Sequence, residues 1–271
     1  MNPKGKLYVV GIGPGSEDLL TLRAVEVIKR SDYVIGHKTY VGRIRHLVRG
    51  EVIESGMGRE VERVRLAVEL AENSIVSLIS GGDPSVYGML PLVVEYVAES
   101  GRNVEIEAIP GVTALSAASP LLGSPISGDH AVISLSDLLI PWEVIEKRLR
   151  YSLRADFVIA IYNPSSRKRE GNLVRALQIV VEEKGDLPVG VVRNASREGE
   201  EVLILKASEI VSNPGLVDMN TLLIIPSSET RVRNGVMYTP RGYSRKYRLV
   251  EGGEEGKEDE EDRSGQGVKE K

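Results

Sequence analysis

Cysteine is absent from the 271-residue chain, and histidine occurs only three times. The absence of cysteine excludes disulfides, thiolate metal sites and cysteine nucleophiles together. The histidines, His37, His46 and His130, show no HExxH motif or comparable ligand spacing. We therefore expect no protein-bound catalytic metal.

Long apolar runs and large aromatic side chains are scarce as well. No apolar run approaches the roughly 18 residues of a membrane span, so we expect no membrane partner. The segment MNPKGKLYVVGIGPG enters an apolar strand without the regions of a signal peptide, which predicts a cytoplasmic location. The chain has one Phe, one Trp and no basic strand studded with aromatics, so nucleic acid is not an expected partner.

Negative charge is distributed unevenly. The whole chain carries 35 Lys and Arg against 39 Asp and Glu, a net charge of −4. Residues 251–271 alone hold nine acids and four bases, which leaves 30 acids and 31 bases in residues 1–250. This segment has one apolar side chain, Val268, and cannot offset the entropy of ordering, so we predict an acidic disordered tail. The remaining body is nearly neutral, which permits an acidic substrate.

Strand-like and helix-like apolar patterns alternate along the rest of the chain. The first strand ends at glycines, and the helix after it carries Leu22, Val25 and Ile28 at helical spacing. Such alternation predicts an α/β protein with largely parallel sheets covered by helices. Strands are predicted at 7–12, 33–35, 75–79, 104–109, 131–135, 157–161, 189–192, 201–205 and 221–225, and helices at 21–30, 60–71, 90–99, 113–118, 141–152 and 168–184.

A Pro- and Gly-containing stretch, SPLLGSPISGDH at residues 119–130, separates two halves of this pattern. It predicts two domains. We assign an N-terminal α/β domain to residues 1–118, the connection to 119–130, a C-terminal α/β domain to 131–250 and the tail to 251–271.

Four loops rich in small residues follow predicted strands, where open α/β sheets bind ligands. They are GIGPG at 11–15, SGGDP at 80–84, PGVTA at 110–114 and the Asn163-Pro164 pair. Bare backbone in such loops can approach a ligand closely. GIGPG resembles a dinucleotide-binding turn but lacks its full glycine pattern, so an NAD(P)-dependent oxidoreductase stays an alternative. Each loop alone could also be a plain turn, yet together they favour a ligand cleft.

At this level of detail the sequence closely resembles the tetrapyrrole methylase family, over roughly residues 6–230. The resemblance rests on GIGPGSEDLLTLRAVEVIKRSDYVIG, SGGDPSVYGM, IPGVTALSAASPLLGSP, ISLSDLLIPWEVIEKRLR and ADFVIAIYNPSSRKR. The last two, with GHKTY at 36–40, resemble the precorrin-3B C(17)-methyltransferase group and its cobalt-precorrin-3 members. Two departures are Ser16, where many relatives have Asp, and residues 226–230, PSSET, where Gly-Asn-Ser is usual.

The resemblance implies a two-domain tetrapyrrole methylase-like fold with a ligand cleft between the domains, and a homodimer. It implies S-adenosylmethionine as the methyl donor and C(17) methylation of a precorrin-3-type tetrapyrrole, with ring contraction, in cobalamin synthesis. Cobalt would belong to the substrate. The donor-binding positions that it implies are Pro14, Gly81, Gly82, Asp83, Val86, Thr113, Ala114, Asn163, Asn194 and Ala195.

Basic side chains and one histidine are candidates for contact with the acceptor. Tetrapyrroles carry several carboxylates, for which Lys38, Arg43, Arg45 and Arg167 are the expected partners. His37 follows a predicted strand and is the candidate for acid–base chemistry or substrate contact. An ordinary exposed position explains His37 equally well, and an ordinary solvated surface charge is the favoured explanation for any one of the cations.

Two further alternatives remain at this point. The chain could methylate another corrin precursor, or it could be a non-catalytic corrinoid-binding module, since the altered PSSET loop departs from the family pattern.

Overall fold

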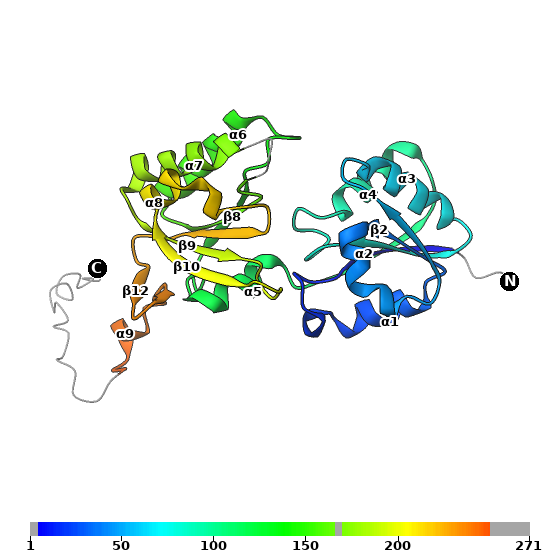
Figure 1. Ribbon diagram of the computed structural model, residues 1–271, viewed down its shortest axis with the longest axis horizontal. Helices are drawn as coiled ribbons and strands as arrows, with labels where there is room; N and C mark the ends of the chain where they lie inside the picture. The colour runs from blue at the N-terminus through cyan, green and yellow to red at the C-terminus, as the bar shows by residue number, and fades with distance from the viewer. Residues whose placement is uncertain (1–4, 166–169, 250–271) are drawn as a thin grey trace, which may run out of the picture.

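The computed structural model describes residues 5–165 and 170–249, so the predicted acidic tail lies outside the described residues. The chain forms two lobes that lie side by side along the long axis (Figure 1), each built on a five-stranded sheet. A small third sheet lies beside the second lobe. No helix in the two described segments is long and apolar enough to cross a membrane.

The elements of the first lobe are β1 (Lys6–Gly11), α1 (Leu22–Arg30), β2 (Tyr33–His37), α2 (Lys38–Ile44), β3 (Glu51–Ser55), α3 (Glu60–Leu70), β4 (Ile75–Ser80), α4 (Leu90–Ser100) and β5 (Glu105–Ile109). Those that follow are α5 (Ala114–Leu122), β6 (Gly123–Ser124), β7 (His130–Ser134), α6 (Trp142–Arg154), β8 (Val158–Tyr162), α7 (Glu170–Lys184), β9 (Pro188–Arg193), β10 (Glu201–Lys206), α8 (Ala207–Ser212), β11 (Thr221–Ile225), β12 (Arg231–Arg233), β13 (Val236–Tyr238) and α9 (Tyr243–Lys246). Short 3-10 helices span Glu17–Leu19, Arg45–Leu47 and Pro214–Leu216.

The first sheet is parallel throughout, in the order β3-β2-β4-β1-β5. Side chains of β1 alternate between two apolar cores: Leu7 and Val9 pack with α3 and α4, whereas Tyr8 and Val10 pack with α1 and α2. A strand buried on both faces reads as a continuous apolar run, which explains why β1 was recognisable from the sequence.

The chain leaves β1 and its neighbour β4 in opposite directions. After β1 it crosses toward β2 and β3, whereas after β4 it crosses back over β1 to β5. A crevice opens at such a reversal, outside the carboxyl ends of the two strands.

The second sheet has the order β10-β9-β11-β8-β7 and is mixed. Only β7 and β8 pair in parallel; β11 runs antiparallel to both of its neighbours, and β9 and β10 form an antiparallel pair. The expectation of a largely parallel second sheet was therefore wrong. Residues 194–200 between β9 and β10 are too few for the helical crossover that parallel strands require.

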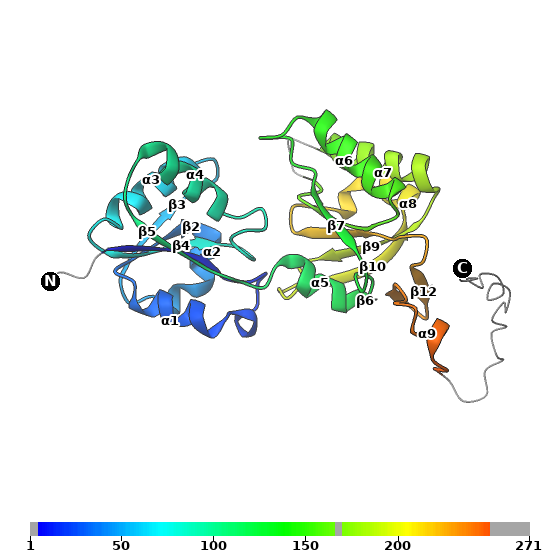
Figure 2. The same ribbon diagram turned by 180° about the vertical axis from the view of Figure 1, so that it is seen from behind.

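Helix α5 belongs to the second core, although its sequence lies within the predicted first domain and connection. Leu115, Ala118 and Leu122 pack with Val158 and Ala160 of β8. The helix continues through Pro120, which we had interpreted as part of a linker. We therefore propose that the lobes meet at residues 110–113, and both views of the ribbon show α5 on the second lobe's side of the connection (Figures 1 and 2).

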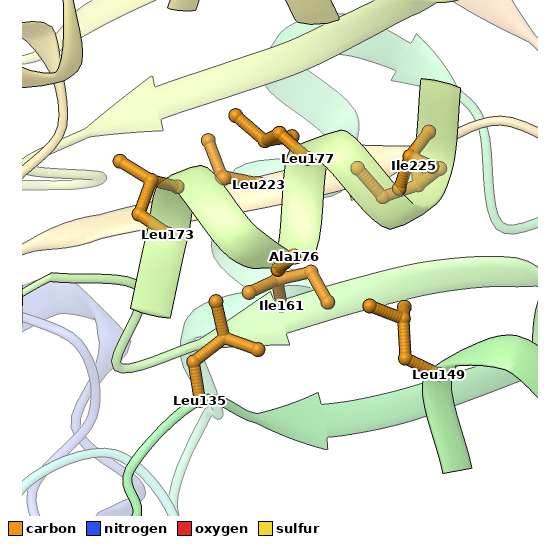
Figure 3. Close-up of a pocket in the computed structure, with 9 residues that line it drawn as sticks. Leu135, Leu149, Ile161, Leu173, Ala176, Leu177, Leu223 and Ile225 are labelled. Atoms are coloured by element: carbon orange, nitrogen blue, oxygen red, sulfur yellow. The ribbon is translucent and has the colours of Figure 1, made fainter. Parts of the chain in front are cut away.

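The interior of the second lobe is an apolar layer between α7 and the sheet (Figure 3). All the side chains that line the space shown there are apolar, and the space does not admit a water molecule. This region is a packed core, and the ligand site must lie elsewhere. Its lining residues are Leu135, Leu149, Ile161, Leu173, Ala176, Leu177, Val180, Leu223 and Ile225.

Two elements of the first lobe were not predicted, β3 and α2. Strand β3 is at the edge of the sheet and its sequence, EVIES, carries little apolar character. Helix α2 is a short helix of seven residues that begins directly where β2 ends.

Candidate functional site

Three glycine-containing loops meet at the carboxyl edge of the first sheet. They follow β1 (residues 11–15), β4 (residues 81–84) and β5 (residues 110–113), which are adjacent in the sheet. This edge includes the reversal between β1 and β4, where open α/β sheets bind ligands. The sequence placed these loops correctly because each comes directly after a predicted strand, although β5 (EIEAI) carries two glutamates.

The loops are held to one another by their backbones. The Gly13 amide donates to the Gly82 carbonyl (3.2 Å), and the Gly82 amide donates to the Gly13 carbonyl (2.8 Å). Both glycines have positive φ, +72° and +64°, a conformation that costs other residues energy. A Cβ on Gly111 would lie 2.2 Å from the Gly82 carbonyl oxygen, and one on Gly11 would lie 2.7 Å from the same atom. Glycine is therefore required at positions 11 and 111 because the loop backbones pack closely together there.

Asp83 fastens two of these loops together. Its Oδ1 accepts hydrogen bonds from the Ser85 amide (2.8 Å) and the Ser85 hydroxyl, and its Oδ2 accepts from the Gly111 amide (3.1 Å). Burial raises the pKa of this carboxyl, but the hydrogen bonds from Ser85 and from the Gly111 and Val86 amides outweigh it, so the pKa is lowered. Asp83 is thus an ionised clamp on the loop.

We expect Asp83→Asn to lower the free energy of unfolding by about 1 kcal/mol at neutral pH, since an amide nitrogen would face the Gly111 amide. A carboxyl whose pKa is lowered on folding stabilises the fold at pH values above its ordinary pKa of 3.8. This contribution disappears as the pH falls through the lowered pKa. Urea melts of both proteins from about pH 6 to about pH 3 should therefore converge at the acid end. A difference that is independent of pH would contradict the assignment.

The second lobe contacts this edge through Tyr162, the last residue of β8. Its phenol oxygen accepts a hydrogen bond from the Leu115 amide (2.8 Å) and shares another with the Thr113 hydroxyl (2.6 Å). Burial raises the pKa of Tyr162, so the phenol stays neutral. Its ring lies 5.4 Å from that of Tyr87, whose hydroxyl donates to the Val132 carbonyl of β7 (3.0 Å).

The second-lobe candidates lie at the same end of their sheet. Asn163 follows β8 and Asn194 follows β9, and both have positive φ, 49° and 53°. The Asn163 amide donates to the Ser134 hydroxyl (2.9 Å), and the Asn194 amide donates to the Gly199 carbonyl (3.3 Å). Ala195 is buried, so any direct contact from this position comes mostly from backbone.

Two first-lobe candidates flank the loops. Val86 is half-buried, and its amide donates to the Asp83 carbonyl (3.3 Å) in the turn after β4. Ala114 is the first residue of α5, next to Thr113. The positions of these residues are consistent with a shared site, and their roles toward a donor remain predictions.

His37 ends β2 and caps α2. Its Nδ1 accepts a hydrogen bond from the Thr39 amide (3.3 Å), and its ring lies edge-on to Tyr40 at 5.7 Å. Burial lowers the pKa of His37, with further lowering by the charges of Arg63 and Lys38. The ring is therefore neutral at pH 7 with its proton on Nε2, which makes Nε2 a hydrogen-bond donor.

Arg43 and Arg197 converge on Pro14. Arg43 on α2 and Arg197 in the loop between β9 and β10 both donate to the Pro14 carbonyl oxygen, the former at 3.4 Å. The Ser16 amide also donates to the Ser196 hydroxyl (3.3 Å). Sequence reasoning missed Arg197, and its only signal there was a basic residue two positions after the candidate Ala195.

The other predicted cations do not join this cluster. Arg45 forms an ion pair with Glu54 of β3 (3.0 Å), and Lys38 is exposed at the start of α2. Arg167 lies outside the described residues. Over residues 5–165 and 170–249, no group of three or more His, Asp or Glu is arranged to hold a metal ion.

The divergent PSSET loop lies away from the site. Because β11 runs antiparallel to β8 and β9, its end points to the opposite edge of the second sheet. There the Ser228 amide donates to Asp156 (3.0 Å) and the Thr230 hydroxyl pairs with that of Thr239 (2.8 Å). The unusual sequence of this loop therefore does not change the glycine-containing loops described above.

Comparison with known proteins matches residues 6–211 to the family described as Tetrapyrrole (Corrin/Porphyrin) Methylases. The chain belongs to the tetrapyrrole methylase family. The predicted α/β fold is also confirmed by a solved tetrapyrrole methylase, the methyltransferase CobJ. It superposes with a TM-score of 0.81 at 32% identity, over 87% of this chain and 100% of that one.

Curated tetrapyrrole methylases give closer sequence matches. A cobalamin biosynthesis protein CbiHC from Archaeoglobus fulgidus is 60% identical over 92% of this chain, which spans only 55% of that longer protein. A probable cobalt-factor III C(17)-methyltransferase from Salmonella typhimurium is 46% identical over 88% of this chain and 99% of its own length. A uroporphyrin-III C-methyltransferase from Thermus thermophilus, solved in complex with S-adenosylhomocysteine, has a TM-score of 0.62 at 27% identity, over 82% of this chain and 92% of that one.

Proposed function

We propose that this tetrapyrrole methylase transfers the methyl group of S-adenosylmethionine to C(17) of a cobalt-factor III or precorrin-3B type macrocycle, with ring contraction, in cobalamin synthesis. The observation that carries the proposal is the match to the Salmonella C(17)-methyltransferase along nearly the whole of that protein. The joined loops at the carboxyl edge of the first sheet support the proposal, because open α/β sheets bind ligands at that edge.

The residues at this edge fit a nucleoside donor. Gly82 has no side chain, and a Cβ placed there would meet only Thr113 and Val112 at 3.9 Å, so the backbone is open on that side. We propose that the loops containing Pro14, Gly81–Asp83 and Thr113–Ala114 hold the donor from the first lobe, with Val86 beside them. Asn163, Asn194 and Ala195 would face it from the second lobe.

The bound donor supplies an activated methyl group on a sulfonium. The contribution of the protein is then to hold the acceptor carbon in line with that group and to keep water away. Contacts between the lobes, from Thr113 to Tyr162 and from Pro14 to Arg197, place the two halves of the site with respect to each other. His37 would donate a hydrogen bond from its neutral Nε2–H to the macrocycle and would not act as a base.

We expect His37→Ala to lower kcat/KM by about tenfold and His37→Gln to retain most of it, because glutamine also offers an N–H donor. The pKa of His37 is lowered by burial, and protonation in acidic buffer would leave the Nε2–H in place, so activity should not follow this titration; a base would instead lose activity as the pH falls through the lowered pKa. Rate profiles of the three proteins against pH test this. Equal losses in both variants would favour a base, and intact turnover in His37→Ala would remove any role.

The decisive experiment is incubation with isotopically labelled donor and either cobalt-factor III or precorrin-3B, followed by mass analysis and NMR location of the methyl group. Label at C(17) supports the proposal, and the preferred acceptor shows whether cobalt is already present. Label elsewhere indicates another corrin precursor as substrate. Binding of the macrocycle without transfer indicates a non-catalytic module, and binding of NAD(P) in place of S-adenosylhomocysteine indicates the oxidoreductase.

The proposal includes a homodimer that acts in the cytoplasm without a resident metal. The homodimer rests on the family resemblance, and the other two rest on the sequence. Light scattering tests the first: a homodimer has twice the 29.6 kDa of one chain. Metal analysis of the purified active enzyme tests the last.

A further inference from the structure

We propose that Arg43 and Arg197 form a carboxylate-binding clamp that closes across the two lobes. The inference deepens the proposed function, because the carboxylate would belong to the methyl donor or to the acceptor macrocycle. Neither the family resemblance nor the sequence pointed to Arg197, and the pairing exists only in the folded chain.

The two guanidinium groups are neighbours because both donate to one atom, the Pro14 carbonyl oxygen. Arg197 is further fixed by a hydrogen bond to the Asn220 side-chain oxygen (2.9 Å), at the start of β11. Its methylene chain packs where Gly15 lacks a side chain, since a Cβ on Gly15 would lie 2.2 Å from the Arg197 Cγ. Arg197 of the second lobe therefore packs against the loop at residues 11–15 of the first lobe.

Arg43 is held in a different way. Its guanidinium carbon lies 5.6 Å from the centre of the Tyr40 ring, and that ring in turn packs on Gly81, where a Cβ would lie 2.9 Å from the ring. Stacking on an aromatic ring leaves the N–H edge of a guanidinium available for an anion. Only one N–H of Arg43 has a protein partner among the described residues, the long contact to Pro14.

The cluster carries positive charge, and its two arginines form no ion pair with Asp or Glu within the part of the chain that the structure describes, residues 5–165 and 170–249. Burial lowers the pKa of Arg197, and the charge of Arg43 lowers it further, while Tyr40 and Asp218 act in the opposite direction. Asp218 is itself engaged by the Thr221 hydroxyl (2.9 Å). Two like charges held together in a half-buried place favour the binding of an anion between them.

A carboxylate is the anion that the chemistry favours. Arginine forks pair with planar carboxylates through two parallel hydrogen bonds. Two sources reach this place under the proposed function: the amino-acid carboxylate of the donor, and the acidic side chains on the rim of the macrocycle. The clamp is the same for both, and binding measurements separate them.

The test compares Arg43→Gln, Arg197→Gln and the double variant with Arg102→Gln and Arg154→Gln. The control arginines lie on the same two lobes but pair with Glu72 and Glu183 on the surface. Glutamine Nε2 can take the place of Arg197 Nε, which donates to the Pro14 carbonyl, so Arg197→Gln can keep the loop contact while the charge is lost. Arg43 reaches Pro14 through its more distant Nη1, so Arg43→Gln loses the charge together with that long contact. Circular dichroism and thermal melts check that all variants fold.

Calorimetry measures the affinity for S-adenosylhomocysteine and for 5′-methylthioadenosine, which lacks the amino-acid carboxylate. Fluorescence quenching measures the affinity for uroporphyrin III, a macrocycle with carboxylate side chains. We expect each clamp variant to weaken one carboxylate probe by about tenfold or more, with the controls unchanged. The double variant should lose less than the product of the single losses, because both arginines hold one group.

Weaker S-adenosylhomocysteine with unchanged 5′-methylthioadenosine assigns the clamp to the donor carboxylate. Weaker uroporphyrin with unchanged S-adenosylhomocysteine assigns it to the acceptor. Equal weakening of S-adenosylhomocysteine and 5′-methylthioadenosine overturns the proposal, since it shows that the arginines only position the loop. Unchanged affinity for every probe also overturns it. If the wild-type protein methylates no macrocycle, the proposed function is refuted. The binding results would still decide whether the two arginines hold a carboxylate.

Discussion

Gly111→Ala is expected to weaken S-adenosylhomocysteine binding by about 100-fold. The added Cβ would lie 2.2 Å from the Gly82 carbonyl oxygen and 2.9 Å from the Gly11 carbonyl carbon. Both neighbours are backbone atoms that cannot rotate away as a side chain can. Relief therefore requires the β5 loop to move off the other two, which also breaks the hydrogen bond from the Gly111 amide to Asp83.

The matched control is Gly42→Ala, on helix α2. A Cβ at Gly42 meets nothing within 4 Å, and alanine is preferred over glycine in a helix, so binding should be unchanged and stability slightly higher. Calorimetric titration with S-adenosylhomocysteine and thermal melts separate the two outcomes. Wild-type affinity in Gly111→Ala would show that the three loops are not fixed by backbone packing.

Tyr162→Phe is expected to lower the free energy of unfolding by about 2 kcal/mol and to weaken donor binding together with it. The lost hydroxyl leaves the Leu115 amide without its acceptor and the Thr113 hydroxyl without its partner. An unpaired buried amide costs more than the hydrogen bond contributes, because the group has already lost water. The change lies at the end of β8, yet the affected groups lie at the start of α5 and in the loop after β5.

Tyr151→Phe is the control for this change. Tyr151 on α6 is 61% exposed, so loss of its hydroxyl should leave both the melting temperature and the S-adenosylhomocysteine affinity as in the wild type. If Tyr162→Phe behaves like this control, the contact between the lobes has no part in forming the site.

Several residues of the candidate site could be placed from the sequence because a local rule locates them. Gly81, Gly82 and Asp83 follow the apolar strand IVSLIS directly, and the carboxyl ends of parallel strands gather at one edge of the sheet. For one glycine of the neighbouring loop, Gly111, the reason differs from the one expected. At Gly111 the structure shows contact between loop backbones, where the sequence had suggested a close approach to ligand.

Other features had no local signal. Tyr162 is the last residue of a strand and looks like any half-buried tyrosine until its hydroxyl is seen to reach Thr113, 49 residues away. Arg197 lies 183 residues from Pro14, and nothing near either residue links them. The proton position on His37 follows from the Thr39 amide and cannot be read from the residue type.

By itself, the sequence determined the α/β class, the family and the loops at the carboxyl edge of the first sheet. Those properties depend on short-range patterns: buried strands read as apolar runs, and the turns after them need small residues. The tertiary structure alone decided the antiparallel course of β11, the transfer of α5 to the second core and the meeting of Arg43 with Arg197. These depend on contacts between segments far apart in the chain, which periodicity and composition do not encode.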